Sequence, residues 1–155
     1  MGEPSSSLLT ATREALERID AHVYRDSMRE IRPIGSGSFG SAVLVEMAVT
    51  HEQFVAKKIT LEHLGDDDKQ KARNEADLLR SLRHANITEY FGSFVTASTL
   101  HIIMEYCSGG SLQQVMSRRE RSGETFETEE VYDWFLQIAL ALAHVHRHKI
   151  LHRDI

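Results

Sequence analysis

Runs of alternating apolar and polar residues predict a series of short strands along the first two thirds of the chain. β-Branched and aromatic residues are frequent in these runs, and polar turn residues separate them. The runs span residues 28–34, 42–49, 54–60, 87–95 and 99–104. The second run should return antiparallel to the first, and the last two should form a hairpin around a short polar turn.

Apolar residues at three- and four-residue spacing predict helices over 9–23, 66–82 and 128–147, and a shorter one after Ser111. Ser111 and Gln114 have the spacing of a capping box, and Thr128 is expected to cap the longest helix. That helix is apolar on several faces, so it should be buried on several sides. The helix at 9–23 has only a sparse apolar stripe, which favours packing onto the domain over binding a partner protein.

One charge on the helix at 66–82 needs an explanation. Glu75 lies on an apolar stripe with Ala72, Ala76, Leu79 and Leu82. A carboxylate in such a position is costly to bury alone, so it should have a cationic partner.

Composition narrows the class of protein. The 18 basic and 23 acidic residues give a net charge of −5, which argues against a nucleic-acid binder. Cys107 is the only cysteine, which excludes an intramolecular disulfide and fits a reducing compartment. No apolar run reaches the roughly 18 residues of a membrane span. We therefore expect a soluble, cytoplasmic protein with no membrane or nucleic-acid partner.

Four histidines near the end of the chain raise the question of a metal site. They are His144, His146, His148 and His152. On a helix, His144 and His148 share a face and His146 points elsewhere. No carboxylate or thiolate completes a ligand set, so we expect no metal site.

The segment Gly35-Ser36-Gly37-Ser38-Phe39-Gly40 has three glycines at G-x-G-x-x-G spacing. Glycine lets a backbone approach an anion closely. The same spacing opens dinucleotide-binding folds, but those require a helix after the glycines, and strands follow here. A glycine loop between two strands is typical of a flap that covers nucleotide phosphates. The alternative is a tight hairpin that needs glycine for structural reasons only.

Lys57 and Lys58 are adjacent on the third predicted strand, so only one of them can point into a cleft beneath the loop. Val55, Lys57 and Ile59 share one face of that strand. Phe54, Ala56 and Lys58 share the other.

Four landmarks in this order resemble the N-terminal half of a eukaryotic protein kinase domain: the glycine loop, a strand lysine, Glu75 and His152-Arg153-Asp154. The residues in and around these landmarks are most similar to those of the NIMA-related (NEK) serine/threonine kinases. The segments that carry the resemblance are Gly37-Ser38-Phe39-Gly40-Ser41-Ala42, Leu44-Val45, His84-Ala85-Asn86-Ile87, Met104-Glu105-Tyr106-Cys107-Ser108-Gly109-Gly110-Ser111-Leu112 and Ile150-Leu151-His152-Arg153-Asp154-Ile155.

The resemblance covers residues 25–155 and implies an α+β fold. A smaller lobe at 25–107 would contain a five-stranded antiparallel sheet and one regulatory helix. The first helices of a larger, helical lobe would follow at 108–155, and residues 1–24 would be an N-terminal extension.

The resemblance also implies roles. Family spacing from the last glycine assigns the phosphate contact to Lys57, with Glu75 as its partner, and leaves Lys58 exposed. Asp154 would orient the substrate hydroxyl. Met104 would be the gatekeeper, Glu105 to Cys107 the hinge, and Ser111 would replace the acidic residue that many kinases use to hold the ribose. The implied nucleotide-binding residues are Ile34, Gly35, Ser36, Gly37, Ser38, Phe39, Gly40, Ala42, Val55, Lys57, Met104, Glu105, Cys107 and Ser111.

The sequence ends at Ile155, before the asparagine and the Asp-Phe-Gly aspartate that hold Mg²⁺ in the family. ATP and Mg²⁺ are the implied cofactors, but no metal ligand is assigned to these residues. We expect the 155 residues alone to be a fragment of a serine/threonine kinase, inactive by itself, with exposed apolar surface on the helix at 128–147. The alternative is a non-catalytic nucleotide-binding or interaction module. Protein substrates are the implied partners, a further partner could bind the helix at 9–23, and the family suggests association with the cytoskeleton.

Overall fold

The computed structural model describes residues 14, 16, 19–37, 40–62 and 64–152. The chain divides into two compact units. The first, called here the sheet unit, comprises Met1–Ser81 and Glu89–Tyr106. The second, the helical unit, comprises Leu82–Thr88 and Cys107–Ile155.

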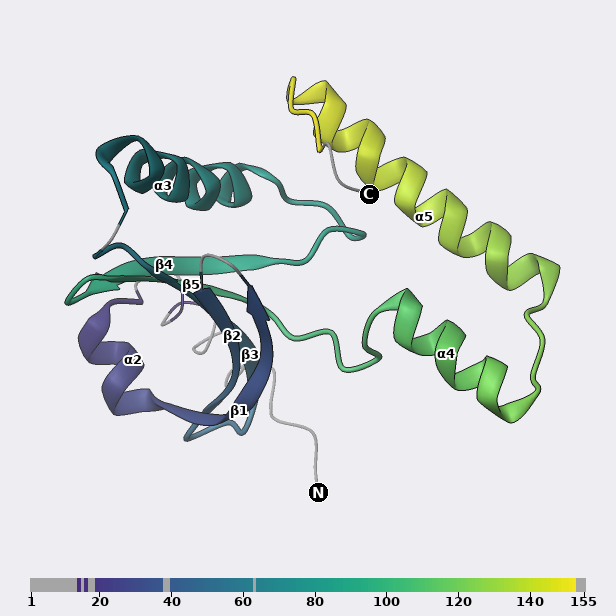
Figure 1. Cartoon of the computed structure of the whole chain (residues 1–155), viewed down its shortest axis with the longest axis horizontal. Helices are drawn as coiled ribbons and strands as arrows, with labels where there is room; N and C mark the ends of the chain where they lie inside the picture. The colour runs from purple at the N-terminus through teal and green to yellow at the C-terminus, as the bar shows by residue number, and fades with distance from the viewer. Residues whose placement is uncertain (1–13, 15, 17–18, 38–39, 63, 153–155) are drawn as a thin grey trace. The chain divides into compact units, whose positions relative to one another are not determined.

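Within the described residues, the sheet unit contains one five-stranded sheet in the order β1-β2-β3-β5-β4, in which every neighbouring pair is antiparallel (Figure 1). The α+β fold expected from the sequence is confirmed. The strands are β1 (Met28–Gly37), β2 (Gly40–Met47), β3 (Gln53–Thr60), β4 (Tyr90–Thr96) and β5 (Thr99–Glu105). Among the described residues, the sheet unit includes the helices α2 (Ala21–Ser27) and α3 (Asp66–Ser81).

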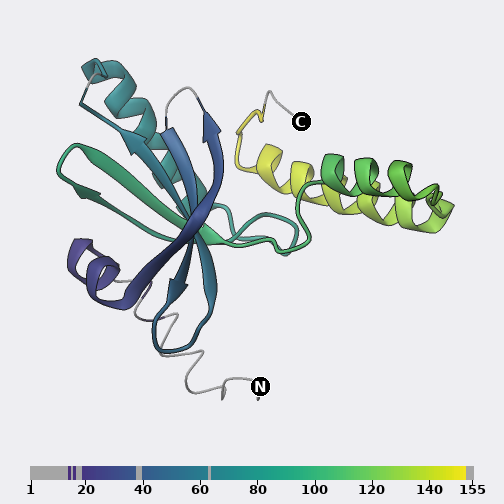
Figure 2. The ribbon, with the colours of Figure 1, turned by 60° about the horizontal axis from the view of Figure 1, so that its bottom comes forward.

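The two faces of the sheet are covered by different helices, with α3 on one side and α2 on the other (Figures 1 and 2). Alternation along β3 explains the two cores. Ile59 packs with Ala72 and Ala76 of α3. Phe54 and Ala56 join the core on the α2 side. Apolar residues on both faces of the central strands therefore hold a helix on each side.

The N-terminal helix expected over 9–23 is wrong in its extent. Residues 14 and 16 are helical, residues 19 and 20 are not, and α2 begins at Ala21. Asp20 is the N-cap residue of α2, because its carboxylate accepts hydrogen bonds from the backbone N–H groups of His22 and Val23. The remaining residues of the expected helix before Ile19 lie outside the described residues.

The expectation that this segment packs onto the domain is confirmed. Leu16 is fully buried and Ile19 nearly so, both in the core on the α2 side. Tyr24 of α2 belongs to the same core. Residues that precede the expected smaller lobe thus supply part of the interior of the sheet unit.

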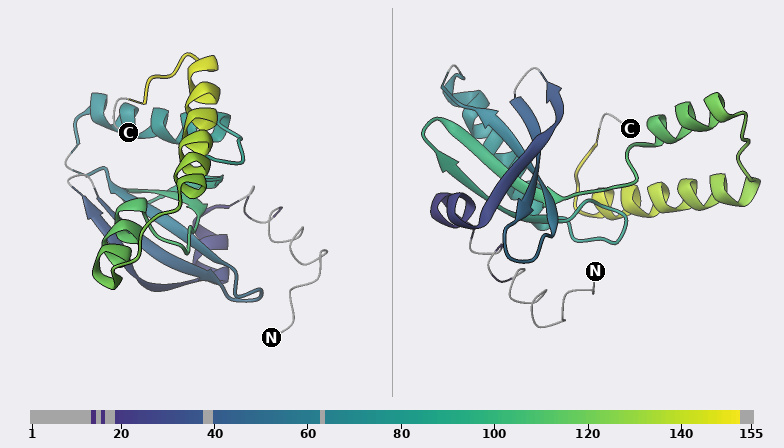
Figure 3. Two further views of the ribbon diagram at one scale, coloured as in Figure 1. Left: turned by 90° about the vertical axis from the view of Figure 1, so that its right-hand side faces the viewer. Right: turned by 90° about the horizontal axis from the view of Figure 1, so that it is seen from below.

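The helical unit contains α4 (Leu112–Ser122) and α5 (Thr128–Arg147), joined by a loop (Figure 3). The capping box of Ser111 and Gln114 is confirmed. The expectation that Thr128 caps α5 is wrong, because the N-cap residue is Glu127, whose carbonyl accepts the hydrogen bond from Val131 N–H. The guanidinium of Arg119 in α4 donates to both carboxylate oxygens of Glu130, at 2.6 and 2.7 Å, and so ties the two helices together.

The burial on several sides that the apolar sequence of α5 predicted is not observed, because several of its apolar side chains are exposed. This is the exposed apolar surface that was expected for the 155 residues alone. Tyr132 and Phe135 are each 68% exposed. The others with large exposed area on this helix are Val131, Leu136, Ile138 and Leu140. Among the described residues, no helix is both long and apolar enough to cross a membrane.

Candidate nucleotide site

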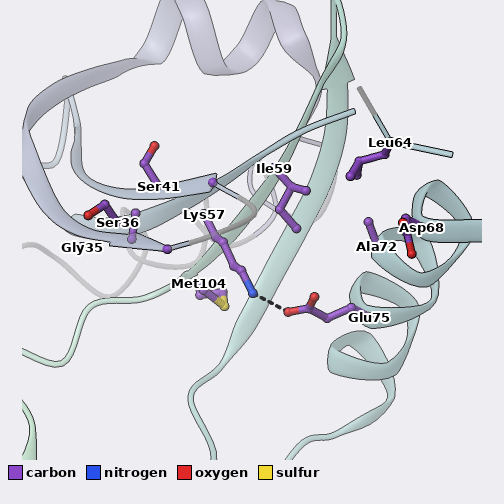
Figure 4. Close-up of a pocket in the computed structure, with 13 residues that line it drawn as sticks. Gly35, Ser36, Ser41, Lys57, Ile59, Leu64, Asp68, Ala72, Glu75 and Met104 are labelled. Atoms are coloured by element: carbon purple, nitrogen blue, oxygen red, sulfur yellow. Dashed lines mark hydrogen bonds and ion pairs between the residues drawn. The ribbon is translucent and has the colours of Figure 1, made fainter. Parts of the chain in front are cut away.

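A cavity of about 600 Å³ opens in the sheet unit between the β1–β2 hairpin, β3 and α3. Its size falls within the range of about 300–1,000 Å³ that small-molecule sites occupy. Figure 4 shows the lysine and glutamate side chains meeting inside it. The lining residues are Gly35, Ser36, Gly37, Gly40, Ser41, Ala42, Lys57, Ile59, Leu64, Asp68, Ala72, Glu75 and Met104.

The glycine loop forms one wall as a paired hairpin. Ser36 pairs with Ser41 and Gly37 with Gly40. A Cβ at Gly40 would lie 1.8 Å from the backbone oxygen of Lys58, so only glycine fits there. A Cβ at Gly37 would meet nothing within 4 Å, so the protein itself does not demand glycine at that position. The alternative interpretation, a tight hairpin that needs glycine for structural reasons only, therefore explains Gly40 but not Gly37.

The expected pairing of Lys57 with Glu75 is confirmed. Lys57 Nζ lies 2.5 Å from Glu75 Oε1, with 40% and 42% of the two side chains exposed (Figure 4). Lys57 comes from β3 and Glu75 from α3, so the ion pair joins the sheet to the helix. Glu75 thus has the cationic partner that was predicted from its place beside Ala72 and Ala76, although its own carboxylate is not buried.

The expectation that Lys58 is an exposed lysine is wrong. Its side chain is 23% exposed, and its Nζ lies 2.6 Å from Glu30 Oε1 on the other side of the sheet. Because adjacent strand residues point to opposite faces, Lys57 and Lys58 each meet a different carboxylate.

Several residues implied to bind nucleotide do not line the cavity. Ile34 and Glu105 lie outside its lining, and Val55 is buried on the Lys57 face without reaching it. Cys107, which is exposed, and Ser111, the N-cap of α4, belong to the helical unit. Ser38, Phe39 and Asp154 lie outside the described residues.

Sequence reasoning missed five lining residues. Ile59 was recoverable, because it shares the strand face of Lys57. Asp68 and Ala72 were also recoverable in part, since they precede Glu75 by seven and three residues and so share its helix face. No signal identified Leu64 or Ser41 as lining residues.

The histidine-rich end of the chain contains a cluster of tilted imidazole rings. The ring centroids of His84 and His144 are 5.0 Å apart, and those of His144 and His148 are 4.5 Å apart. Burial lowers the pKa of His144, and the nearby His148 lowers it further. Within the part of the chain that the structure describes, no three histidine, cysteine or carboxylate side chains are placed to hold a metal ion.

A paired glycine hairpin, a strand lysine and a helix glutamate around one cavity are the geometry of a kinase smaller lobe. The model of the protein kinase domain family matches residues 28–155, and the chain belongs to that family.

The curated relatives are NEK-related serine/threonine kinases. The chain is 42% identical over 125 residues to serine/threonine-protein kinase Nek1 of Mus musculus, covering 81% of this chain and 10% of that protein. It is 39% identical over 130 residues to Nek3 of Mus musculus, covering 84% and 24%. It is 38% identical over 130 residues to Nek5 of Homo sapiens, covering 84% and 18%. The chain thus spans at most about a quarter of the length of these three relatives.

Proposed function

We propose that this chain is the ATP-binding part of a NEK-type serine/threonine protein kinase, which transfers the γ-phosphate of ATP to protein hydroxyls. The single observation that carries the proposal is the ion pair of Lys57 and Glu75 inside a cavity walled by the glycine hairpin. The kinase match and the NEK relatives support the same reaction.

The lining residues suit the two ends of ATP. Near Gly37, open space beside the backbone leaves room for phosphate oxygens to approach its N–H groups. The Lys57 ammonium would contact the α- and β-phosphates, and Glu75 would hold it there. Met104 offers an apolar surface for the base. Glu105 to Cys107, which do not line the cavity, would hold the adenine edge by family resemblance alone. Phosphoryl transfer demands positioning and charge neutralisation rather than covalent chemistry, which is what these groups supply.

The remaining roles rest on the family. Asp154 would orient the substrate hydroxyl, Ser111 would hydrogen-bond the ribose, and Mg²⁺ would bind residues that follow Asp154 in the family. For the 155 residues by themselves we therefore propose ATP binding without measurable phosphotransfer. Protein substrates are the proposed partners, and the cytoplasm is the proposed location. The N-terminal helix predicted over 9–23 is a second proposed contact for a partner protein.

Calorimetric titration of ATP into the chain, with and without Mg²⁺, tests the proposal. We expect binding that Lys57→Met weakens at least tenfold, because an ammonium–phosphate contact is charge-assisted. Lys58→Met is the matched control, since it removes the neighbouring ammonium from the opposite face. Equal losses in both variants, or no binding by the unmodified chain, would contradict the assignment.

Catalysis is tested separately on the protein as it exists in the cell. Phosphate transfer from ATP to a serine or threonine peptide should disappear in Asp154→Asn. A form that binds ATP but transfers no phosphate would favour the non-catalytic nucleotide-binding module instead.

A further inference from the structure

Two side-chain contacts within the helical unit hold the segment 82–88 on helix α5. The Nδ2 atom of Asn86 donates a hydrogen bond of 3.1 Å to Oε1 of Gln137, which lies 51 positions later in the chain. The ring of His84 lies against the ring of His144, with centroids 5.0 Å apart. The first contact joins two uncharged amides, so the imidazole contact is the one that a change of pH can alter.

The hydrogen bonds around the two rings suit neutral imidazoles. His84 Nδ1 accepts the backbone N–H of Asn86 at 3.1 Å, so this nitrogen carries no proton. His144 Nε2 is buried and has no hydrogen-bond partner among the described residues. A proton added to His84 Nδ1 would break the bond to Asn86. Protonation of His144 would leave a charged, buried ring with one nitrogen lacking an acceptor, which is costly.

The charges around His144 also oppose its protonation. Burial is the main cause that lowers the pKa of His144, and the neighbouring His148, His84 and Arg147 lower it further. All three neighbours are bases. Within the part of the chain that the structure describes, the groups that shift this pKa include no carboxylate. An imidazolium formed at this position would therefore have no counter-charge to stabilise it.

His148 completes the group at the end of α5. Its ring centroid lies 4.5 Å from that of His144, and its Nδ1 lies 2.9 Å from the backbone oxygen of the same residue. His148 is the C-cap residue of α5 and stands four positions before the His152-Arg153-Asp154 motif. The segment 82–88 in turn follows directly after α3, the helix that carries Glu75. The three rings of His84, His144 and His148, called here the histidine cluster, thus join two stretches of chain that adjoin proposed site residues in the sequence.

We propose that the histidine cluster is a pH-sensitive switch: neutral imidazoles hold the segment 82–88 on α5, and protonation releases it. Because the pKa of His144 in the folded chain lies below its ordinary value, the contact is complete above about pH 6.5 and is lost as the pH falls through the folded pKa. The switch goes beyond the proposed function, and its test does not depend on ATP binding.

Hydrogen exchange of the Asn86 and Ile87 amides, followed by NMR on the full chain from pH 7.5 to 5, tests the switch. The first amide bonds His84 Nδ1 at 3.1 Å and the second bonds the His84 carbonyl at 3.0 Å, so both report on the segment. For an ordinary pKa of about 6.5, exclusion of one proton shifts the equilibrium by up to about 30-fold at pH 5. After correction for the intrinsic pH dependence of exchange, we expect protection of both amides to fall at least about threefold over this range.

Two variants assign the effect to protons on the cluster. His144→Phe keeps a ring against His84 but takes up no proton, so at least about half of the fall in protection, on a logarithmic scale, should disappear. His146→Phe is the matched control, because His146 is exposed on the same helix. His148→Gln removes a base that lowers the pKa of His144, so the midpoint of the fall should move to higher pH.

Each outcome supports or overturns the proposal. Equal protection at pH 7.5 and pH 5 in the unmodified chain overturns it. A fall that is as large in His144→Phe as in the unmodified chain, or that His146→Phe also removes, overturns it as well. If His144→Phe does not fold, His148→Gln decides the question. A midpoint at higher pH supports the switch, whereas lower protection at every pH with an unmoved midpoint indicates a merely structural role and overturns it.

Discussion

Replacing Gly92 by alanine tests whether the N-terminal residues are an integral part of the sheet unit. Gly92 lies in β4, and a Cβ there would be 2.4 Å from Ile19 Cγ2 and 2.9 Å from the backbone oxygen of Leu16. Non-bonded carbon atoms pack favourably at separations of about 3.5 Å or more, so Ile19 Cγ2 would have to move by about 1 Å. No rotamer change can move the Leu16 carbonyl, so the segment must shift as a whole.

The magnitude depends on how far the segment moves. If it shifts in place, the cost is that of overpacking a core, about 1–3 kcal/mol. Leu16 is 0% exposed and Ile19 7%. If the segment is released, each of these side chains returns to water at a cost of about 1.5–3 kcal/mol.

Hydrogen exchange of the β4 and β5 amides measures this cost within the sheet unit, without a contribution from the helical unit. Gly65→Ala is the matched control, because a Cβ at Gly65 meets nothing within 4 Å. Ile19→Ala removes the Cγ2 atom, so its combination with Gly92→Ala should cost less than the sum of the two. Equal protection in Gly92→Ala and Gly65→Ala, or strict additivity with Ile19→Ala, would refute the packing.

Three further predictions concern other parts of the chain. Burial lowers the pKa of His101 below its ordinary value of about 6.5, so the stabilisation from neutral His101 should be complete above that pH and be lost as the pH drops through the folded pKa. Urea unfolding midpoints from pH 7.5 to 5 measure this loss. If the midpoints depend on pH in the same way in His101→Phe, His101 is not its source. Gly40→Ala should abolish the pairing of β1 with β2, which hydrogen exchange of their amides measures. Gly37→Ala should preserve that pairing and weaken ATP binding. The reverse pattern would contradict the space found around the two glycines. Arg119→Lys loses one of the two hydrogen bonds to Glu130, so the protection of α4 amides from hydrogen exchange should fall. Unchanged protection would show that the Arg119–Glu130 pair does not hold α4 and α5 together.

The sheet could be predicted from short-range periodicity, whereas the central ion pair also needed the resemblance to the kinase family. Alternation along β3 separates Lys57 from Lys58, and helical spacing places Glu75 on the face of α3 that packs on the sheet. A carboxylate on that face required a cation, and the neighbouring strand had one available. Residue type and period thus called for a lysine opposite Glu75, and the family spacing from the last glycine identified that lysine as Lys57.

Features that depend on tertiary contacts could not be read in this way. Ile19 lies outside a helix and packs against Gly92, more than seventy positions later in the sequence. Lys58 has the same residue type and strand context as Lys57, and its partner Glu30 lies 28 positions away on another strand. Spacing within one element carries no information about such partners.

The three glycines of the loop show why its spacing is weaker evidence of function than it first suggests. Gly40 is required by the backbone oxygen of Lys58, which a Cβ would strike. That requirement is set by the hairpin and β3, so a chain that bound no nucleotide would still need glycine there. Gly37 has no such neighbour and gains its significance from the Lys57–Glu75 pair in the same cavity. The case for an ATP site therefore depends on Gly37 together with that ion pair, and the proposed comparison of Gly37→Ala with Gly40→Ala separates the glycine that serves the ligand from the glycine that serves the fold.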